Sequence, residues 1–251
     1  GVLVLGPMAF LDDRFRLPAS LRLVVQAVVA LIIFATGSQI YTLTNPFLAD
    51  GLINLDSIDI PIHFQFFNIS FFEVFPFWSG IFTVIWLMLT VNALNWFDGI
   101  PGQVSVLAGI AFLVIGFLSA SDRVDQDDVA LIALTLAAIA AGGLLFEIPI
   151  HRVLPGDTGA MFYGLMLGTL TIYAGGKVAT AFLVLGVPLI DLAIVVAHRV
   201  ASGKNPLKGS AHGEHLHHRL LDKGWTPGSV ILLTAALGGT EPGAVSQHRN
   251  Q

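Results

Sequence analysis

The chain has 251 residues, of which 55% are hydrophobic and only 12% are charged, and its mean hydropathy is +0.78. Soluble domains carry about 25% charged residues, so this composition excludes an ordinary soluble domain and predicts an integral membrane bundle. A net charge of −5 gives no basic footprint for nucleic acid, and the lack of cysteine excludes disulfides and a thiol nucleophile.

The apolar runs predict an all-α, polytopic membrane bundle with about seven to eight transmembrane segments. A helix needs about 20 residues to cross the hydrocarbon, and the candidate runs are residues 21–40, 75–96, 104–120, 129–146, 159–173, 178–200 and 229–239. The first eleven residues, GVLVLGPMAFL, resemble the end of another span. We therefore expect one transmembrane domain over residues 1–251, clipped at both ends.

Residues 41–73 differ from these runs, because they alternate apolar and polar residues through INLDSIDIPIHFQFF. Such alternation predicts a short β-hairpin or an amphipathic segment. The segment contains four acidic residues and no Lys or Arg, so we place it outside the membrane on the non-cytoplasmic side.

The distribution of Lys and Arg predicts the orientation in the membrane. One set of alternate loops carries nine such residues and the other set carries three, namely Arg123, Lys177 and Arg249. The nine-residue side should be cytoplasmic. The acidic and histidine-rich motifs described next all emerge on that cytoplasmic face.

The stretch 92–102, NALNWFDGIPG, follows one of the most apolar runs. Asn92, Asn95 and Asp98 recur every third residue and would share one face of a helix. Polar groups in a bilayer are costly and usually face a cavity or a partner. The pattern predicts a polar site at the membrane surface.

Asp12 and Asp13 lie at a helix-to-loop boundary in LDDRFRLP. They could form a solvated helix cap with Arg14 or Arg16, since caps favour Asp. Alternatively, the adjacent carboxylates supply oxygen ligands for Mg²⁺, or one of them acts as a base.

Asp157 lies between glycines in LPGDTGA, just before an apolar run. Asp157 or Thr158 could simply cap the following helix. In the other interpretation, the helix N-terminus offers N–H groups to a phosphate while Asp157 holds the metal that neutralises it.

The run 209–224, GSAHGEHLHHRLLDKG, brings four histidines close to basic residues. Imidazoles at this spacing suit either a zinc site or the binding of a phosphorylated ligand. Asp191 and His198 share a helix face in the preceding run PLIDLAIVVAHR. We interpret His198 as serving helix packing or interfacial solvation. Asp191 lies deeper in apolar sequence and is the stronger candidate for a functional role.

Carboxylates, helix ends, basic residues and histidines on one membrane face together indicate phosphate chemistry with a divalent metal. The sequence contains no GxxxxGK[ST], GxSxG or HExxH, so a P-loop, an α/β-hydrolase and a zincin are unsupported.

At these motifs the sequence resembles the polyprenyl-phosphate N-acetylhexosamine-1-phosphate transferases of glycosyltransferase family 4. The likeness covers nearly the whole chain and is closer to the WecA-like branch than to the related MraY-like branch. The matching motifs, in the order of the family, are LDDRFRLPASLRLVVQ, NALNWFDGIPG, PGDTGAMFYG, PLIDLAIVVAHR and GEHLHHRLLDKG.

The resemblance implies transfer of a sugar-1-phosphate, of an N-acetylhexosamine, from a UDP-sugar to polyprenyl (undecaprenyl) phosphate, with release of UMP. The product would initiate a lipid-linked cell-envelope glycan. Mg²⁺ is the implied cofactor, with Mn²⁺ as an alternative. The implied partners are the UDP-sugar, polyprenyl phosphate and membrane lipid, and a homodimer is one possibility for the assembly.

The resemblance also implies roles for individual residues. Asp157 would bind the metal, and Asp12 and Asp13 would support the metal or serve as base near the lipid phosphate. The remaining implied residues are Asn92, Asn95 and Asp98 at the nucleotide and metal site, with Asp98 among the catalytic carboxylates, and His215, His217, His218 and Arg219 on phosphate or sugar groups.

Two positions depart from the family pattern: Pro101 replaces its second Asp, and Glu147 stands where an Asn is usual. They support a second hypothesis, an inactive homologue that binds lipid phosphate or nucleotide without turnover. A third hypothesis is a metal or anion transporter with the histidine loop as its gate.

Overall fold

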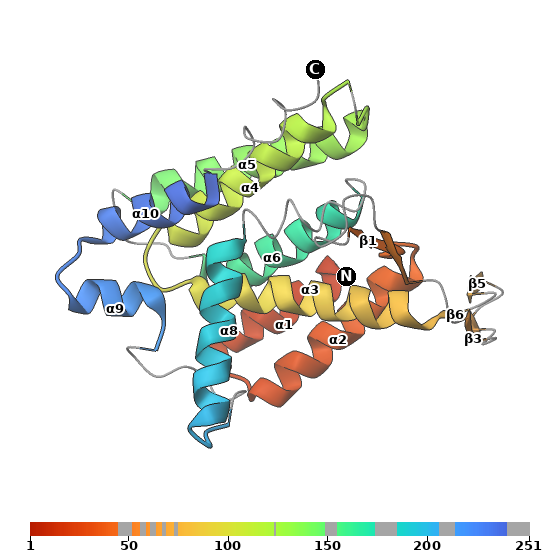
Figure 1. The fold of residues 1–251 in the computed structure, drawn as a ribbon, viewed down its shortest axis with the longest axis horizontal. Coiled ribbons are helices and arrows are strands. Elements are labelled where there is room, and N and C mark those ends of the chain that lie inside the picture. Colours follow the sequence, from red (N-terminus) through yellow and green to blue (C-terminus); the bar gives the residue numbers. More distant parts are fainter. Residues whose placement is uncertain are drawn as a thin grey trace. The chain divides into compact units, whose positions relative to one another are not determined.

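The computed structural model describes residues 1–44, 52–55, 59–60, 64–66, 69–72, 75–122, 124–148, 155–173, 185–205 and 214–239. These residues are mostly helical, as the sequence predicts (Figure 1). They form two compact units, which are described separately. The first comprises residues 1–95 and 156–179, and the second comprises residues 96–155 and 180–251. The single transmembrane domain stays a prediction.

The first unit contains α1 (Val2–Phe15), α2 (Ala19–Ala35), most of α3 (Phe77–Phe97) and α6 (Gly156–Tyr173). Helix α1 packs against α2 and α6. The buried Trp86 joins α3 to α6, because its indole N–H lies 3.2 Å from the carbonyl oxygen of Gly168 and 3.1 Å from the hydroxyl of Thr171.

Short strands follow α2, so the hairpin interpretation of residues 41–73 is confirmed where the structure describes them. Strand β1 (Thr42–Thr44) pairs antiparallel with β2 (Leu52–Asn54), and β4 (Phe64–Phe66) pairs antiparallel with β5 (Ile69–Phe72). A third antiparallel pair joins β3 (Asp59–Ile60) to β6 (Phe75–Pro76).

The second unit contains α4 (Gln103–Ser119), α5 (Asp127–Glu147), α8 (Gly186–Ala201), α9 (Leu216–Asp222) and α10 (Pro227–Gly239). Small residues let α4 and α5 approach closely: a Cβ at Gly109 would lie 3.6 Å from the Cβ of Ala140. The buried face of α5 is an alanine stripe, Ala130, Ala133, Ala137 and Ala140. Such stripes replace large side chains where helices pack within a bilayer.

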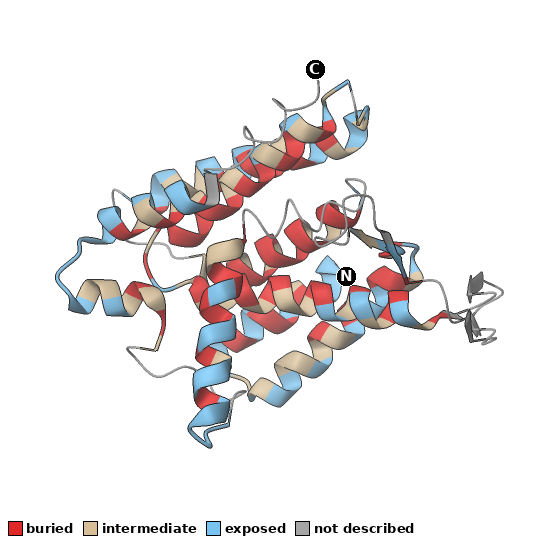
Figure 2. Ribbon diagram, viewed as in Figure 1, coloured by how far each residue is buried: buried red, intermediate tan, exposed pale blue. Residues whose placement is uncertain are grey.

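Among the described residues, α3 and α5 are long and apolar enough to cross a membrane, and α2, α4 and residues 227–237 of α10 are shorter apolar helices. In α5 only 28% of the most apolar 18-residue stretch is buried (Figure 2). Large apolar side chains such as Leu131, Ile139 and Phe146 point outward instead. An outward apolar surface suits lipid rather than water, which supports a membrane helix. The count of seven to eight spans stays a prediction, and residues 178–184 of the sixth run lie outside the described residues.

Gly164 lets α6 lie directly on the backbone of α3. A Cβ at this position would approach the carbonyl oxygen of Thr90 and the Cα of Val91 to 2.7 Å. Because backbone atoms cannot rotate away, we expect Gly164→Ala to lower the melting temperature by roughly 5 °C, the effect of about 1–2 kcal/mol of overpacking. Thermal unfolding in detergent measures this. Gly142→Ala in α5 is the matched control, since a Cβ there meets nothing within 4 Å. Equal melting temperatures for the two variants would contradict this packing.

Candidate functional site

The N-terminus of α6 is capped by a carboxylate from α1. The Asp13 Oδ1 atom accepts the N–H of Asp157 at 2.8 Å, and Oδ2 accepts the N–H and the hydroxyl of Thr158 at 3.2 and 2.6 Å. Neither Asp157 nor Thr158 caps the helix, as one interpretation of the sequence proposed. Asp13 also occupies two of the N–H groups that the other interpretation offered to a phosphate. A negative charge at this helix end is favourable, so the cap joins α1 firmly to α6.

Asp12 holds the turn between α1 and α2. Its carboxylate accepts the N–H of Leu17 at 2.7 Å and an N–H of the Arg22 guanidinium at 2.9 Å. The side chain is only 3% exposed, so it is not the solvated cap that the sequence suggested. Its partner is Arg22, in the first turns of α2, rather than Arg14 or Arg16.

Asp157 lies beside this pair, in the first turn of α6 and before its apolar run begins. Its Oδ1 accepts an N–H of the Asn95 amide at 2.8 Å, and its Oδ2 lies 3.6 Å from Arg22. Burial, together with the neighbouring Asp12 carboxyl, raises the pKa of Asp157 to about 6, against the lowering effect of Asn95. The carboxylates of Asp12 and Asp157 therefore converge on one guanidinium, and the nearby Asp13 carboxylate adds to their repulsion, which a divalent cation would relieve.

The residues of the predicted polar face have different surroundings. Asn92 donates to the Gln26 side chain at 2.6 Å and to the Met88 carbonyl at 2.7 Å, so within the described contacts it ties α3 to α2. Asn95, one turn later, reaches Asp157. Helix α3 ends at Phe97, so Asp98 lies just beyond the helix instead of on its face.

The second unit contains the histidine segment, defined here as residues 214–219. His215 is buried, and its Nδ1 lies 2.7 Å from Oδ2 of Asp191 in α8. The ring of His215 stacks on that of His217, with an interplanar angle of 2° and centroids 5.6 Å apart. His217 is adjacent to His218, whose ring centroid lies at 4.2 Å, and Arg219 is exposed.

Gly99 is where the NALNWFDGIPG stretch meets the histidine segment. A Cβ on Gly99 would lie only 2.0 Å from Nε2 of His217, which also packs edge-on against Phe97 with ring centroids at 6.0 Å. Only a glycine leaves room for the imidazole here. Two motifs that lie more than a hundred residues apart in the sequence are thus in contact within this unit.

Glu147 has a structural role in this unit. Its buried carboxylate accepts the N–H of Gly102 at 2.9 Å and the hydroxyl of Ser105 at 2.6 Å, at the start of α4. The acidic residue that departs from the family pattern therefore caps α4 and fixes the turn that follows Asp98.

No three His, Asp or Glu side chains are grouped as a ready-made metal site in the part of the chain that the structure describes. This gives no support to the zinc hypothesis for the histidine segment, with His212 lying outside the described residues. The carboxylates of the first unit still fit a divalent cation chemically, because they are hard oxygen donors crowded beside one guanidinium.

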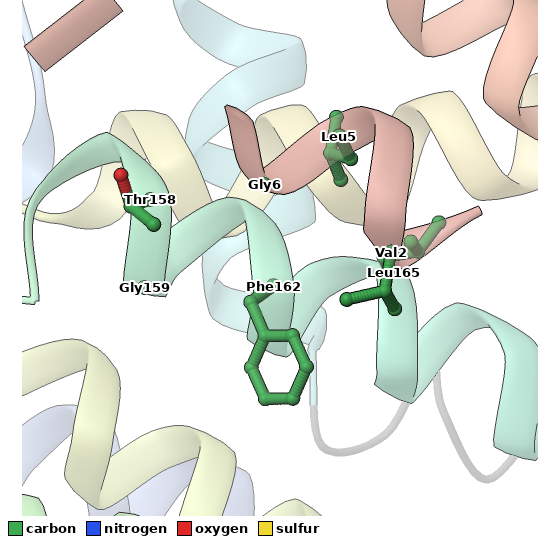
Figure 3. A pocket seen from close by; sticks show the side chains of 7 residues that line it. All are labelled: Val2, Leu5, Gly6, Thr158, Gly159, Phe162 and Leu165. Atoms are coloured by element: carbon green, nitrogen blue, oxygen red, sulfur yellow. The ribbon is translucent and has the colours of Figure 1, made fainter. Parts of the chain in front are cut away.

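An apolar groove of about 290 Å³ runs between α1 and α6, beginning at Thr158 (Figure 3). Its lining comes from both helices: Val2, Leu5, Gly6, Gly159, Phe162 and Leu165. Since the Thr158 hydroxyl is bonded to Asp13, the groove leads directly away from the carboxylate cluster.

Sequence reasoning missed Arg22 and Thr158 as partners of the carboxylates, and Gln26 as the partner of Asn92. Arg22 was counted only for the orientation, although an arginine in the first turns of an apolar helix is itself a signal of a buried anionic partner. Gln26, one turn further along the same face of α2, is only 4% exposed.

The helices and the acidic cluster define a helical protein with an anionic site at a helix end. The chain belongs to the family described as glycosyl transferase family 4, whose model matches residues 1–175.

Its relatives include transferases of both branches that the motifs indicate. The chain is 26% identical to a Bacillus subtilis (strain 168) protein named probable undecaprenyl-phosphate N-acetylglucosaminyl 1-phosphate transferase, over 95% of this chain and 61% of the relative. It is 25% identical to the undecaprenyl-phosphate alpha-N-acetylglucosaminyl 1-phosphate transferase of Escherichia coli K12, over 94% and 61%. It is 29% identical to a phospho-N-acetylmuramoyl-pentapeptide-transferase of Levilactobacillus brevis, over 64% and 49%. The chain spans about three fifths of the length of the first two relatives.

The raised pKa of Asp157 makes a prediction about stability. The folded carboxyl holds its proton up to about pH 6, whereas its ordinary value is 3.8. The folded state therefore loses stability as the pH rises from about 4 to 6 and stays at the lower level above that range. Without metal, we expect Asp157→Asn to melt about 3 °C above the parent at pH 7.5 and within about 1 °C of it at pH 4, since the side chain is 33% exposed and partly screened.

Thermal unfolding in detergent with a chelator measures this difference. A variant that is less stable than the parent at pH 7.5 would show that the ionised carboxylate contributes net stability, contrary to the arrangement described.

Proposed function

We propose that the chain carries the transfer of a sugar-1-phosphate, of an N-acetylhexosamine, from a UDP-sugar to polyprenyl phosphate. An oxygen of the lipid phosphate attacks the phosphorus next to the sugar, and the bond from that phosphorus to the bridging oxygen breaks. UMP leaves with the bridging oxygen. Family membership and the names of the relatives support the reaction. The carboxylate cluster at the start of α6 is the observation that carries it.

Asp157 is the proposed principal ligand of Mg²⁺, or of Mn²⁺, with Asp12 and Asp13 in support. When bound there, the metal supplies positive charge that neutralises the diphosphate oxygens. Asp157 is the best placed of the three, because its described contacts are with the side chains of Asn95, Arg22 and Asp12, and none of these is a backbone N–H group. Asn95 orients its Oδ1 atom.

Two further side chains of the first unit, Arg22 and Asp13, hold the carboxylate cluster in position. Arg22 balances the charge of Asp12 and Asp157. Asp13 fixes the backbone from which Asp157 projects. In the second unit, Asp98 and the histidine segment keep the proposed roles that the resemblance implies, with His215, His217, His218 and Arg219 on phosphate or sugar groups.

The Lys and Arg bias supports placing this chemistry at the cytoplasmic face of the inner membrane. The acceptor's phosphate belongs at that interface and its chain in the lipid. The groove between α1 and α6 suits the first isoprene units of the chain, because it is apolar along its length and begins at the carboxylate cluster.

The metal assignment is tested by Asp157→Asn in membranes that contain the protein. We expect the variant to lose Mg²⁺-dependent UMP release by at least about 1,000-fold, because the metal loses its charged ligand. The assay supplies polyprenyl phosphate and a panel of UDP-sugars, and follows UMP and the lipid-linked product. Asp222→Asn, an exposed carboxylate at the end of α9, is the matched control. Turnover by Asp157→Asn at the parent's rate would refute the assignment.

The same assay separates the competing functions. UMP without a lipid product would favour a hydrolase. Binding of UDP-sugar without either product would favour the inactive homologue.

The lipid groove is tested by Gly6→Leu. A Cβ at Gly6 meets nothing within 4 Å, so the helix can carry the leucine while its side chain fills the groove. We expect the KM for polyprenyl phosphate to rise about tenfold, the effect of displacing roughly 1–2 kcal/mol of apolar contact. The KM for the UDP-sugar should stay within about twofold of the parent's value.

Gly142→Leu in α5 is the matched control, because it adds the same side chain at another helical glycine with open space around it. An unchanged KM for the lipid in Gly6→Leu would exclude the groove as the acceptor's path.

A further inference from the structure

Helix α8 holds the histidine segment at two places. Asp191 bonds to His215, and Arg199 bonds to Glu214, with its Nε and Nη2 atoms each 2.7 Å from Oε2. The two helical residues are eight positions apart, which corresponds to a rise of about 12 Å. The start of the segment is thus fixed to α8 by two charged contacts in the same unit.

Asp191 makes both of its contacts as an acceptor. Its Oδ2 lies 2.7 Å from Nδ1 of His215, and its Oδ1 accepts the N–H of Leu216 at 2.8 Å. The N–H group of Leu216 can only donate, so Oδ1 of Asp191 is the acceptor in this contact. An ionised carboxylate has no hydrogen to give, so the shared hydrogen belongs to Nδ1 of the imidazole.

The other ring nitrogen of His215 is unused. Its Nε2 is fully buried and has no hydrogen-bond partner among the described residues. In the uncharged ring, a hydrogen on Nδ1 leaves a lone pair at Nε2. A buried acceptor left unsatisfied costs about 1–3 kcal/mol, which a ligand that donates a hydrogen bond would recover.

We propose that Asp191 is a positioning residue that keeps the hydrogen of His215 on Nδ1, so that Nε2 accepts a hydrogen bond from a hydroxyl or amide N–H of the UDP-sugar. This inference rests on the proposed function. It narrows the role of His215 from phosphate or sugar to the donor groups of the nucleotide-sugar. A phosphate oxygen has no hydrogen to offer and would require the hydrogen on Nε2 instead.

The substitution Asp191→Asn should move the ring hydrogen of His215 from Nδ1 to Nε2. The amide oxygen must face the N–H of Leu216, because two donors cannot meet there. The amide NH₂ group then faces Nδ1, which becomes the acceptor, and the hydrogen of the neutral ring moves to Nε2. The volume and the backbone contact are retained, so this change tests the hydrogen's position rather than the packing.

The first measurement needs no variant. The nitrogen spectrum of ¹⁵N-histidine-labelled protein, with His215 assigned by comparison with His215→Gln, should show the Nδ1–H form. Adding UDP-N-acetylglucosamine should move the Nε2 resonance and leave Nδ1 nearly in place. An Nε2–H form in the parent, or a spectrum that UDP-N-acetylglucosamine does not change, would overturn the inference even if UMP release is observed.

The second measurement is binding of UDP-N-acetylglucosamine without acceptor lipid. We expect Asp191→Asn to show the Nε2–H form and a Kd at least about tenfold higher, equivalent to about 1.4 kcal/mol. Asp222→Asn should keep the parent's Kd. Unchanged or tighter binding in Asp191→Asn would assign Nε2 to a phosphate oxygen and overturn the inference.

Both measurements are independent of turnover. Parent protein that binds UDP-N-acetylglucosamine through Nε2 but releases no UMP would contradict the proposed function and retain the role of Asp191. Parent protein that releases UMP, but whose nitrogen spectrum UDP-N-acetylglucosamine does not change, would retain the proposed function and contradict the role of Asp191.

Discussion

The bond network of Asp13 at the start of α6 is the constraint on which the first unit depends. This one carboxylate accepts three hydrogen bonds from two consecutive residues, which lie 144 and 145 positions away in the sequence. It satisfies N–H groups that no helix can satisfy for itself, and it brings Asp157 to Arg22 and Asn95. Together with Arg22, which contacts both Asp12 and Asp157, this cap holds the carboxylates of α1 and α6 near one another against the repulsion of their charges.

Much of the helical framework could be predicted from the sequence, because long apolar runs can bury their backbone polar groups only as helices. Residues 129–146 correspond closely to α5, and residues 104–120 to α4. The hairpins after α2 followed from the alternation of polar and apolar residues.

The hydrogen-bond donors of each carboxylate could not be predicted, because a motif does not show which distant residues will lie beside it in the fold. The arginines nearest to Asp12 in sequence were the obvious candidates, yet helical geometry places Arg22 of α2 opposite it. The helix end offered to phosphate at Asp157 is already capped by Asp13. Asp98 does not share the helix face of Asn92, because α3 ends one residue before it. Gly99, the next residue, lies against the imidazole of His217.

The carboxylates differ in how many hydrogen bonds their oxygens accept within the protein. This difference separates residues that stabilise the fold from a residue that can bind a ligand. Both oxygens of Asp12, Asp13, Glu147 and Asp191 accept donors within the protein. Each therefore fixes a helix end, a turn or an imidazole, and a ligand that recruited it would first have to replace those bonds. Asp157 is different, since its described contacts are with the side chains of Asn95, Arg22 and Asp12 rather than with backbone N–H groups. Burial and the neighbouring Asp12 carboxyl raise the pKa of Asp157, so a nearby cation would favour its ionised form. On this reasoning the four satisfied carboxylates stabilise the framework, and Asp157 is the one of these five whose contacts a ligand would replace most easily.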